Sequence, residues 1–265
     1  MHCFWRNHLH MANVERDEIV DYVQRNIGEF HRRRLESLGR LKLVKLLQRK
    51  NPYLFKAKNI NKAQDLVKVL LDAHLSSQEE GIFGDFLEGL AIFINGRVFG
   101  GRKSSTEGID LEFDHNSVRY IVAIKSGPNW GNSQQVKRMK ANFSTAKRVL
   151  ATSQGRTNVV AVNGCCYGRT RKEHRGEYTK LCGQKFWQLI SDDTELYKDL
   201  IQPLGHEARQ RNEQFCIEYD SVINRFTSEF CTEYCEIGGQ ILWDKIVAIN
   251  SSAYMPKASL QRKKR

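Results

Sequence analysis

The apolar residues of this chain change their spacing near residue 97. Before that point they recur with the 3.6-residue period of amphipathic helices, as at Ile19, Val23 and Ile27. Beyond it, apolar runs of strand length predict strands over residues 97–100, 109–113, 118–126 and 158–163. Helical patterns return over residues 133–150 and 206–236. This order predicts an α/β core with helical additions at both ends.

One helix ahead of the strands is apolar on nearly all sides. Its expected range is 83–95, opened by Gly81 and Gly84, and such a pattern is typical of a core helix. Glu88 lies inside it. Because a buried carboxylate is costly without a cation or a hydrogen bond, we expect Glu88 to face such a partner.

Length and pattern together predict how the chain is divided. With 265 residues it can form one large domain or two small ones. We expect a disordered extension over residues 1–10, a helical region over 11–78, an α/β core over 79–205, a helical region over 206–250 and a basic tail over 251–265.

The balance of charge indicates a polyanionic partner. Lys and Arg total 42 and Asp and Glu total 30, so the formal net charge is +12. Nucleic acid is the first candidate for such a surplus and an anionic membrane surface the second. No run reaches the roughly 18–20 apolar residues of a membrane span, and the basic helix over residues 31–50 contains no Trp or Phe. We therefore expect a nucleic-acid partner and no membrane.

The cysteines indicate a compartment. There are seven of them, and the first ten residues contain no apolar core of a secretory signal. These features predict reduced thiols and a cytoplasmic location. The nearest approach to a zinc cluster lacks the C-x₂₋₄-C pairs of common structural sites, so zinc is the less favoured interpretation. Its members are Cys165, Cys166, His174 and Cys182.

Two short segments in the middle of the chain are predicted to form a hairpin around a polar turn. They are GIDLEF from residue 108 and RYIVAIKSG from residue 119. Since strand side chains alternate, Asp110 and Glu112 share one face, and Ala123 and Lys125 share one face. A register that superposes these faces brings two carboxylates and an ammonium together. The opposite face would carry Ile109, Leu111 and Phe113.

Such a set of groups suits metal-assisted hydrolysis of a phosphodiester. Carboxylate oxygens hold Mg²⁺ together with water molecules. The ion polarises the phosphoryl oxygen and activates a water, and a lysine stabilises the charge that develops on the phosphate. Asp110 or Lys125 alone would be interpreted as a surface charge, and it is their joint spacing that favours a site.

Asp110, followed by a strand that ends in Ile124-Lys125, resembles the motif of the PD-(D/E)XK nucleases. The run YIVAIKSGPNWGN from residue 120 resembles a bacterial type II restriction endonuclease family within that group, as do GCCYG from residue 164 and GQKFW from residue 183. The resemblance covers roughly residues 79–205. It implies a restriction-endonuclease-like fold, with a mixed β-sheet flanked by helices, that cuts double-stranded DNA with Mg²⁺ as a homodimer on a palindromic site. It also implies that Asp110 is a metal ligand and Lys125 the catalytic lysine.

Ala123 departs from the family pattern, because its position should carry Asp or Glu and a methyl group cannot bind a metal. Three explanations are open: Glu88 or Glu112 supplies the missing carboxylate, the chain is an inactivated variant, or it is a natural DNA-binding protein that does not cut. We favour the first, because the apolar surroundings predicted for Glu88 require a cation. The candidate metal ligands are then Asp110, Glu88 and Glu112, and the candidate catalytic residues are Asp110, Glu88 and Lys125.

Two basic segments are candidates for contact with DNA. The helix after the Lys125 strand is expected to meet phosphates through Lys137 and Arg138. Gln134 and Gln135 at its start contact phosphate, support the site or form a polar helix end. The Gly-rich loop over residues 164–183 follows a core strand, where Arg side chains can read guanine edges. Its candidates are Arg169, Arg171, Lys172 and Arg175.

The predicted function is that of a type II restriction enzyme, a sequence-specific endonuclease for double-stranded DNA. Such an enzyme shares a restriction-modification system with a cognate DNA methyltransferase, which is not a physical partner. One alternative is a structure-specific repair or recombination nuclease, which would share the site. The other is a catalytically inactive DNA-binding protein, whose binding would depend steeply on salt.

Overall fold

The computed structural model describes residues 16–154, 158–205 and 208–252. The extension predicted over residues 1–10, and all but the first two residues of the tail predicted over 251–265, lie outside the described residues. Within the described part, no helix combines the length and the apolar character needed to cross a membrane.

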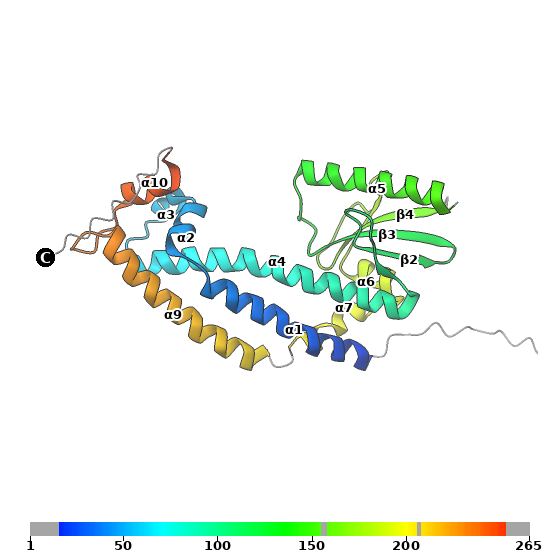
Figure 1. The fold of residues 1–265 in the computed structure, drawn as a ribbon, viewed down its shortest axis with the longest axis horizontal. Coiled ribbons are helices and arrows are strands. Elements are labelled where there is room, and N and C mark those ends of the chain that lie inside the picture. The colour runs from blue at the N-terminus through cyan, green and yellow to red at the C-terminus, as the bar shows by residue number, and fades with distance from the viewer. Residues whose placement is uncertain (1–15, 155–157, 206–207, 253–265) are drawn as a thin grey trace, which may run out of the picture. The chain divides into compact units, whose positions relative to one another are not determined.

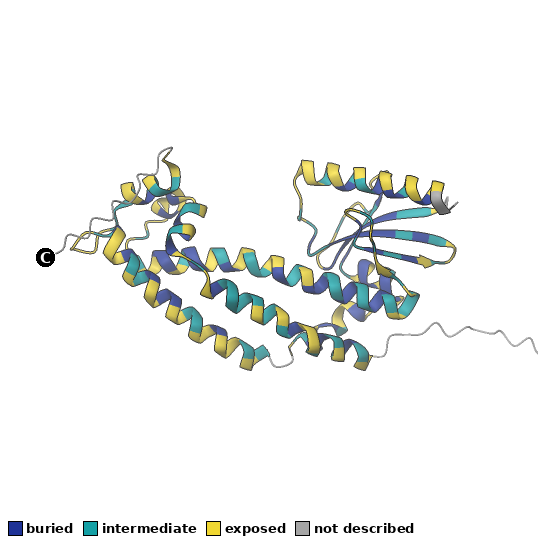
Figure 2. Ribbon diagram, in the orientation of Figure 1, coloured by how far each residue is buried: buried dark blue, intermediate teal, exposed yellow. Residues whose placement is uncertain are grey.

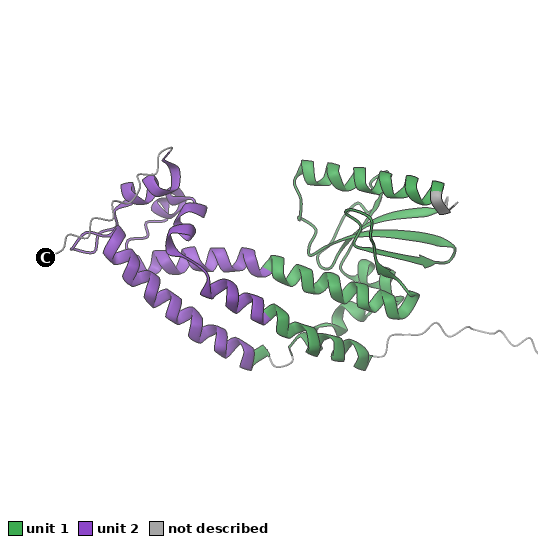
Figure 3. Cartoon of the chain, in the orientation of Figure 1, with its two compact units in different colours: residues 1–30, 80–209 green, residues 31–79, 210–265 purple. Residues whose placement is uncertain are grey.

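The chain forms two compact units (Figure 3). Unit 1 combines residues 1–30 with 80–209, and unit 2 combines residues 31–79 with 210–265. The boundaries fall inside three helices, α1 (Arg16–Gly39), α4 (Ala63–Phe99) and α9 (Ala208–Tyr234). Each of these helices therefore contributes one segment to each unit.

In the described part of unit 1, five strands form one sheet in chain order. The first three are antiparallel, and β3 pairs in parallel with β4 and β4 with β5. The hairpin predicted from the sequence is β2–β3, with Leu111 opposite Val122. The predicted mixed sheet flanked by helices is confirmed. The strands are β1 (Arg102–Lys103), β2 (Leu111–His115), β3 (Val118–Lys125), β4 (Val159–Cys165) and β5 (Thr179–Cys182).

Helix α5 (Ser133–Gln154) covers one face of this sheet (Figure 1). Met139 and Phe143, four residues apart on its apolar side, are buried against Ile121 of β3. Ile109 belongs to the same cluster, although simple alternation predicts it on the opposite face with Leu111. That prediction is wrong because the regular strand begins only at Leu111.

The opposite face of the sheet packs on α1, α4 and the short helices α6 (Gln184–Ser191), α7 (Leu196–Asp199) and α8 (Ile201–Leu204). The middle of β3 is thus buried on both sides, as the dark segments of Figure 2 show. Two-sided burial explains why β3 is a nearly continuous apolar run. The central residues of this second cluster are Leu90, Ile94, Leu111, Val122 and Phe186.

The structure corrects the sequence-based prediction at two elements. Helix α4 runs unbroken from Ala63 to Phe99, so the segment 97–100, predicted as a strand, is mostly the end of this helix. Gly81 and Gly84 lie within the helix, because packing along its length outweighs their weak propensity of about 1 kcal/mol each. β5 lies in the segment predicted to be a loop, where pairing with β4 supplies the hydrogen bonds that the local sequence does not predict.

Unit 2 is helical in its described part. Alongside its segments of α1 and α4 it contains α2 (Leu43–Arg49), α3 (Pro52–Ala57), most of α9 (Ala208–Tyr234) and α10 (Trp243–Ser251). Its own apolar core includes Leu38, Leu46, Leu71, Phe226 and Phe230.

Part of the basic stretch over residues 31–50 is used inside unit 2. Arg34 pairs with Glu79, and its guanidinium lies 3.4 Å from the centre of the Phe215 ring. Lys50 donates to the carbonyl of Ala73 at 2.8 Å. These contacts show that two of the basic residues support the helices of this unit.

Candidate active site

Asp110 lies where the chain enters β2. Gly108 precedes it with a φ of +73°, and a Cβ there would meet the Asn142 side chain at 1.9 Å, so only glycine fits. The backbone N–H of Asp110 donates to Val122 O at 2.8 Å, and the N–H of Ile124 donates to Asp110 Oδ2 at 2.7 Å. The carboxylate therefore replaces a backbone carbonyl in the β2–β3 ladder, which fixes its position.

Lys125 is the last residue of β3, and its ammonium faces this carboxylate. Nζ lies 3.4 Å from Asp110 Oδ2 and 5.5 Å from the centre of the Trp130 ring. The side chains of Lys125 and Asp110 are 31% and 20% exposed, so water screens their attraction only in part. The approach of these two groups, expected from the sequence, is observed, and both remain accessible from solvent.

Glu88 reaches the same place from α4. Gly84, one turn earlier on the same side of the helix, lies against Ser126, and a Cβ on Gly84 would be 3.5 Å from Ser126 Cβ. This close approach brings the Glu88 carboxylate to the end of β3. Lys103 Nζ of β1 lies 3.3 Å from Glu88 Oε1. The expectation that Glu88 faces a cation is confirmed.

The electrostatics of Glu88 connect it to the other two residues. Burial raises the pKa of its carboxyl above the ordinary value, and the Asp110 carboxylate raises it further. Lys103 and Lys125 lower the pKa but do not outweigh the other two effects. Two carboxylates therefore repel each other in a partly desolvated place, and a divalent cation would relieve both effects.

Asp110 and Glu88 are the residues that could hold a metal here. Mg²⁺ is usually bound by one or two carboxylates, with water and substrate phosphate oxygens completing its shell, so this pair fits the ion. The Oε1 of Glu112, the third candidate ligand, pairs with Arg102 Nε at 3.0 Å. Across the described ranges, no three or more His, Cys, Asp or Glu side chains are grouped as a metal site.

Ala123 is a core residue. It is 1% exposed and packs in the cluster that contains Met139 and Phe143 of α5. It shares the face of Lys125, two residues later on β3, and its neighbour across the β3–β4 register is Asn163. The position that should carry an acid by resemblance is therefore filled by a buried methyl group.

The cysteines near the site are packed as small apolar residues. Cys165, Cys166 and Cys182 are buried free thiols. Burial, aided by the neighbouring Cys182, raises the pKa of the Cys165 thiol to about 12, so it is protonated at neutral pH.

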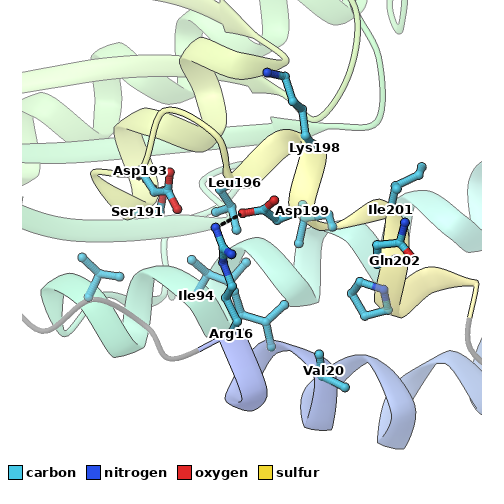
Figure 4. A pocket seen from close by; sticks show the side chains of 14 residues that line it. Arg16, Val20, Ile94, Ser191, Asp193, Leu196, Lys198, Asp199, Ile201 and Gln202 are labelled. Atoms are coloured by element: carbon cyan, nitrogen blue, oxygen red, sulfur yellow. Dashed lines mark hydrogen bonds and ion pairs between the residues drawn. The ribbon is translucent and has the colours of Figure 1, made fainter.

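A cavity of about 620 Å³ in unit 1 is lined by side chains from α1, α4, α7 and α8 (Figure 4). Arg16 and Asp199 form an ion pair at its wall, with 2.7 Å between Nη2 and Oδ2. None of Asp110, Lys125 and Glu88 is among its lining residues. Glu88 and Lys103 instead line a second, smaller cavity of about 360 Å³.

Comparison with known families now decides the group to which these residues belong. The model of the type II restriction endonuclease EcoO109I family matches residues 17–212, which is more than half of the chain and includes the whole site. The chain belongs to this restriction endonuclease family. A search of curated proteins gives no match. Membership makes the chain a restriction nuclease by family and implies that it binds DNA.

In this restriction endonuclease, the outer side of α5 carries the predicted phosphate-contacting residues. Lys137 and Arg138 are exposed, opposite the apolar side that packs on the sheet. Arg138 pairs with Glu107 at 2.6 Å, but both side chains are about three quarters exposed, so water weakens the pair. DNA phosphates can therefore compete for Arg138.

The two glutamines at the start of α5 differ in their contacts. Gln135 and Asn132 cap the helix reciprocally: Asn132 N–H donates to Gln135 Oε1 at 2.9 Å, and Gln135 N–H donates to Asn132 Oδ1 at 3.0 Å. Gln134 is exposed. Of the alternatives drawn from the sequence, the structure shows a helix-capping role for Gln135.

The loop between β4 and β5 presents its basic side chains to solvent. Arg175 is joined to Tyr178 through a backbone hydrogen bond of 2.9 Å, and its guanidinium lies 3.5 Å from Thr170 Oγ1. The N–H of Tyr167 donates to Ser126 O at 3.1 Å, which ties the start of the loop to the end of β3. The exposed predicted DNA-contacting residues are Arg169, Arg171, Lys172 and Arg175.

Sequence reasoning missed two residues of this site. Lys103, the partner of Glu88, lies in a two-residue strand too short to have a sequence pattern. Asn163 is 1% exposed on β4 and donates to Ala123 O at 3.2 Å. Its signal was visible as a single amide inside the apolar run VVAVNGCC, because a polar residue in a buried strand needs specific partners.

Proposed function

We propose that the protein is a sequence-specific endonuclease that hydrolyses phosphodiester bonds in double-stranded DNA with Mg²⁺. The observation that carries this proposal is the packing of α4 on the end of β3 at Gly84 and Ser126, which brings Glu88 toward the ion pair of Asp110 and Lys125. It gives the site a second carboxylate although Ala123 cannot supply one. Family membership supports the nuclease class, and the pair of acids supports the metal.

Each residue of the site has a distinct role in this proposal. Asp110, fixed by the N–H of Ile124, and Glu88 hold the ion through carboxylate oxygens. When bound, the ion would polarise the scissile phosphate and lower the pKa of the attacking water. Lys125 donates to a phosphate oxygen as negative charge develops there, and Asp110 keeps its ammonium in place.

The exposed basic residues are the basis for the proposed recognition of DNA. Lys137 and Arg138 on α5 meet the phosphate backbone, whereas Arg169, Arg171 and their neighbours in the β4–β5 loop read base edges. We further propose a homodimer on a palindromic site, since a two-fold protein matches a two-fold sequence. The enzyme would act in the cytoplasm on DNA that a cognate methyltransferase has left unmodified.

Cleavage of a supercoiled plasmid of mixed sequence tests the proposal. The protein is expected to linearise the plasmid with Mg²⁺ and to leave it intact in EDTA. Asp110→Asn and Lys125→Met are expected to bind the plasmid and leave it uncut. The matched control is Lys68→Met, which removes an exposed charge elsewhere on α4 and should cut normally. If the unmodified protein fails to cut with Mg²⁺ or Mn²⁺, the proposed function is wrong.

The burial of Ala123 favours one alternative, a DNA-binding protein without cleavage. In that case the protein binds DNA with a steep salt dependence and does not cut. The proposed function predicts the opposite result, which is cleavage with Ala123 unchanged.

A further inference from the structure

The ammonium of Lys125 stands at the end of a flexible side chain that is 31% exposed. The ammonium group of an unrestrained lysine samples many positions in solvent, and fixing it in one position costs conformational entropy. Its neighbours in the site include the Asp110 carboxylate at 3.4 Å and the Trp130 ring at 5.5 Å. The second distance lies within the range of about 6 Å in which an aromatic face attracts a cation.

Trp130 can restrain Lys125 only if the loop that carries it is itself held. This loop leaves the end of β3, and loops are normally the more mobile parts of a protein. Here the Trp130 Nε1–H donates to Asn163 Oδ1 at 3.2 Å. Asn163 lies on β4, is 1% exposed, and donates its own Nδ2–H to Ala123 O at 3.2 Å. The indole is therefore fastened to the middle of the sheet.

A second contact fastens the same loop. Lys180 of β5 donates from Nζ to the carbonyl of Pro128 at 2.7 Å. Asn163 and Lys180 are neighbours in the β4–β5 register, so both anchors stand side by side on the sheet. The buried amide of Asn163 is satisfied on both sides, as expected of a polar group that fixes a unique arrangement.

We propose that Trp130, locked by Asn163, is a positioning residue that holds the Lys125 ammonium beside Asp110. The effect of this on catalysis rests on the proposed function, in which Lys125 acts on the scissile phosphate. The contact between ring and ammonium does not depend on it. Asn163 acts through Trp130, and neither residue touches the reacting atoms.

The contact is tested first without any cleavage. The chain has four tryptophans, so a ¹⁵N–¹H spectrum of the indole groups contains four peaks at most, and Trp130→Phe identifies the one for Trp130. Asn163→Ala is expected to move that peak, because the indole N–H loses its acceptor. Lys125→Met is expected to move it as well, because the ring loses its cation. A Trp130 peak that stays in place in both variants overturns the proposal.

Kinetics then separate positioning from a structural role. Trp130→Leu is expected to lower the single-turnover cleavage rate by about threefold to thirtyfold, the range of a partly desolvated cation–π contact, and to leave DNA affinity unchanged. Trp130→Phe keeps an aromatic face and is expected to retain most of the rate. The matched control is Trp243→Leu in unit 2, where Lys56 Nζ lies 5.4 Å from the ring; the rate should not change.

Failure of the proposed function and failure of the positioning role of Trp130 give different results. If the unmodified protein does not cut DNA, the proposed function fails, while the indole spectrum still decides whether Trp130 holds Lys125. If the unmodified protein cuts and Trp130→Leu cuts at the same rate, positioning by Trp130 is refuted and the function stands. If Trp130→Phe and Trp130→Leu lose cleavage rate equally, with matching losses of thermal stability, Trp130 has a structural role only.

Discussion

Replacing Glu88 by glutamine changes one oxygen of the site to nitrogen and leaves its shape intact. The carboxylate is half-buried, and its carboxyl pKa is raised by burial and by Asp110, so its removal relieves an unfavourable interaction. Its ion pair with Lys103 is lost, but that partner is 72% exposed and such pairs contribute about 0–1 kcal/mol. The free energy of unfolding of Glu88→Gln is therefore expected to lie within about 1 kcal/mol of that of the unmodified protein.

The effect on cleavage should be far larger. Metal polarisation of a phosphoryl oxygen is worth several kcal/mol in the transition state, and each 1.36 kcal/mol is tenfold in rate. Loss of one of two metal ligands is thus expected to lower the cleavage rate by about a hundredfold or more at fixed Mg²⁺. Excess Mg²⁺ should restore part of the rate, because one ligand remains.

Single-turnover cleavage of a plasmid across a Mg²⁺ titration measures this effect, with chemical denaturation as the stability measurement. Glu112→Gln is the matched control, because Glu112 pairs with Arg102 of β1 just as Glu88 pairs with Lys103. It should cleave normally. The reasoning is refuted if Glu88→Gln cleaves at the rate of the unmodified protein, or if Glu112→Gln is the variant that fails.

Three further sets of substitutions test the site, the packing of α4 and the proposed DNA contacts. Lys103→Met removes the cation that pairs with the Glu88 carboxylate, so Mg²⁺ no longer competes with it. Half-maximal cleavage should then need about twofold to fivefold less Mg²⁺. A higher Mg²⁺ requirement would contradict this prediction. Gly84→Ala should raise the free energy of unfolding by about 0.5–1 kcal/mol and keep cleavage, since the added Cβ makes an ordinary contact; loss of stability in chemical denaturation would contradict it. Arg171→Ala should weaken cognate binding more than non-specific binding, whereas Arg138→Ala should weaken both alike, as measured by titrating labelled DNA. If both variants lose cognate and non-specific affinity equally, the loop does not read base edges.

The sheet and the first half of the site are predictable from the sequence because they are local. Asp110 and Lys125 lie on segments joined by one turn, so the predicted hairpin brings them close, although Asp110 precedes the regular part of β2. Glu88 could be singled out because a carboxylate in an apolar helix requires a partner. Which partner it meets could not be predicted, because Lys103 lies on a strand of two residues that exists only through pairing with β2.

Other parts depend on tertiary packing that no local pattern shows. Gly81 and Gly84 suggest a helix start, but α4 continues through them, because packing along the helix outweighs the weak helix propensity of glycine. β5 forms only because β4 lies beside it. The roles of Trp130 and Asn163 depend on a hydrogen bond between residues 33 positions apart. In the sequence, Trp130 is only an aromatic residue and Asn163 only an amide.

The most direct test of the account is to incubate long DNA of mixed sequence with the protein and Mg²⁺ and to sequence every end that forms. With Ala123 unchanged, cleavage is expected at one short motif with two-fold symmetry, at the same position in every product. Ends that share no motif, or that lie at branches and mismatches, would indicate a nuclease that reads DNA structure. No ends at all would contradict the claim that Glu88 and Asp110 together replace the acid missing at Ala123.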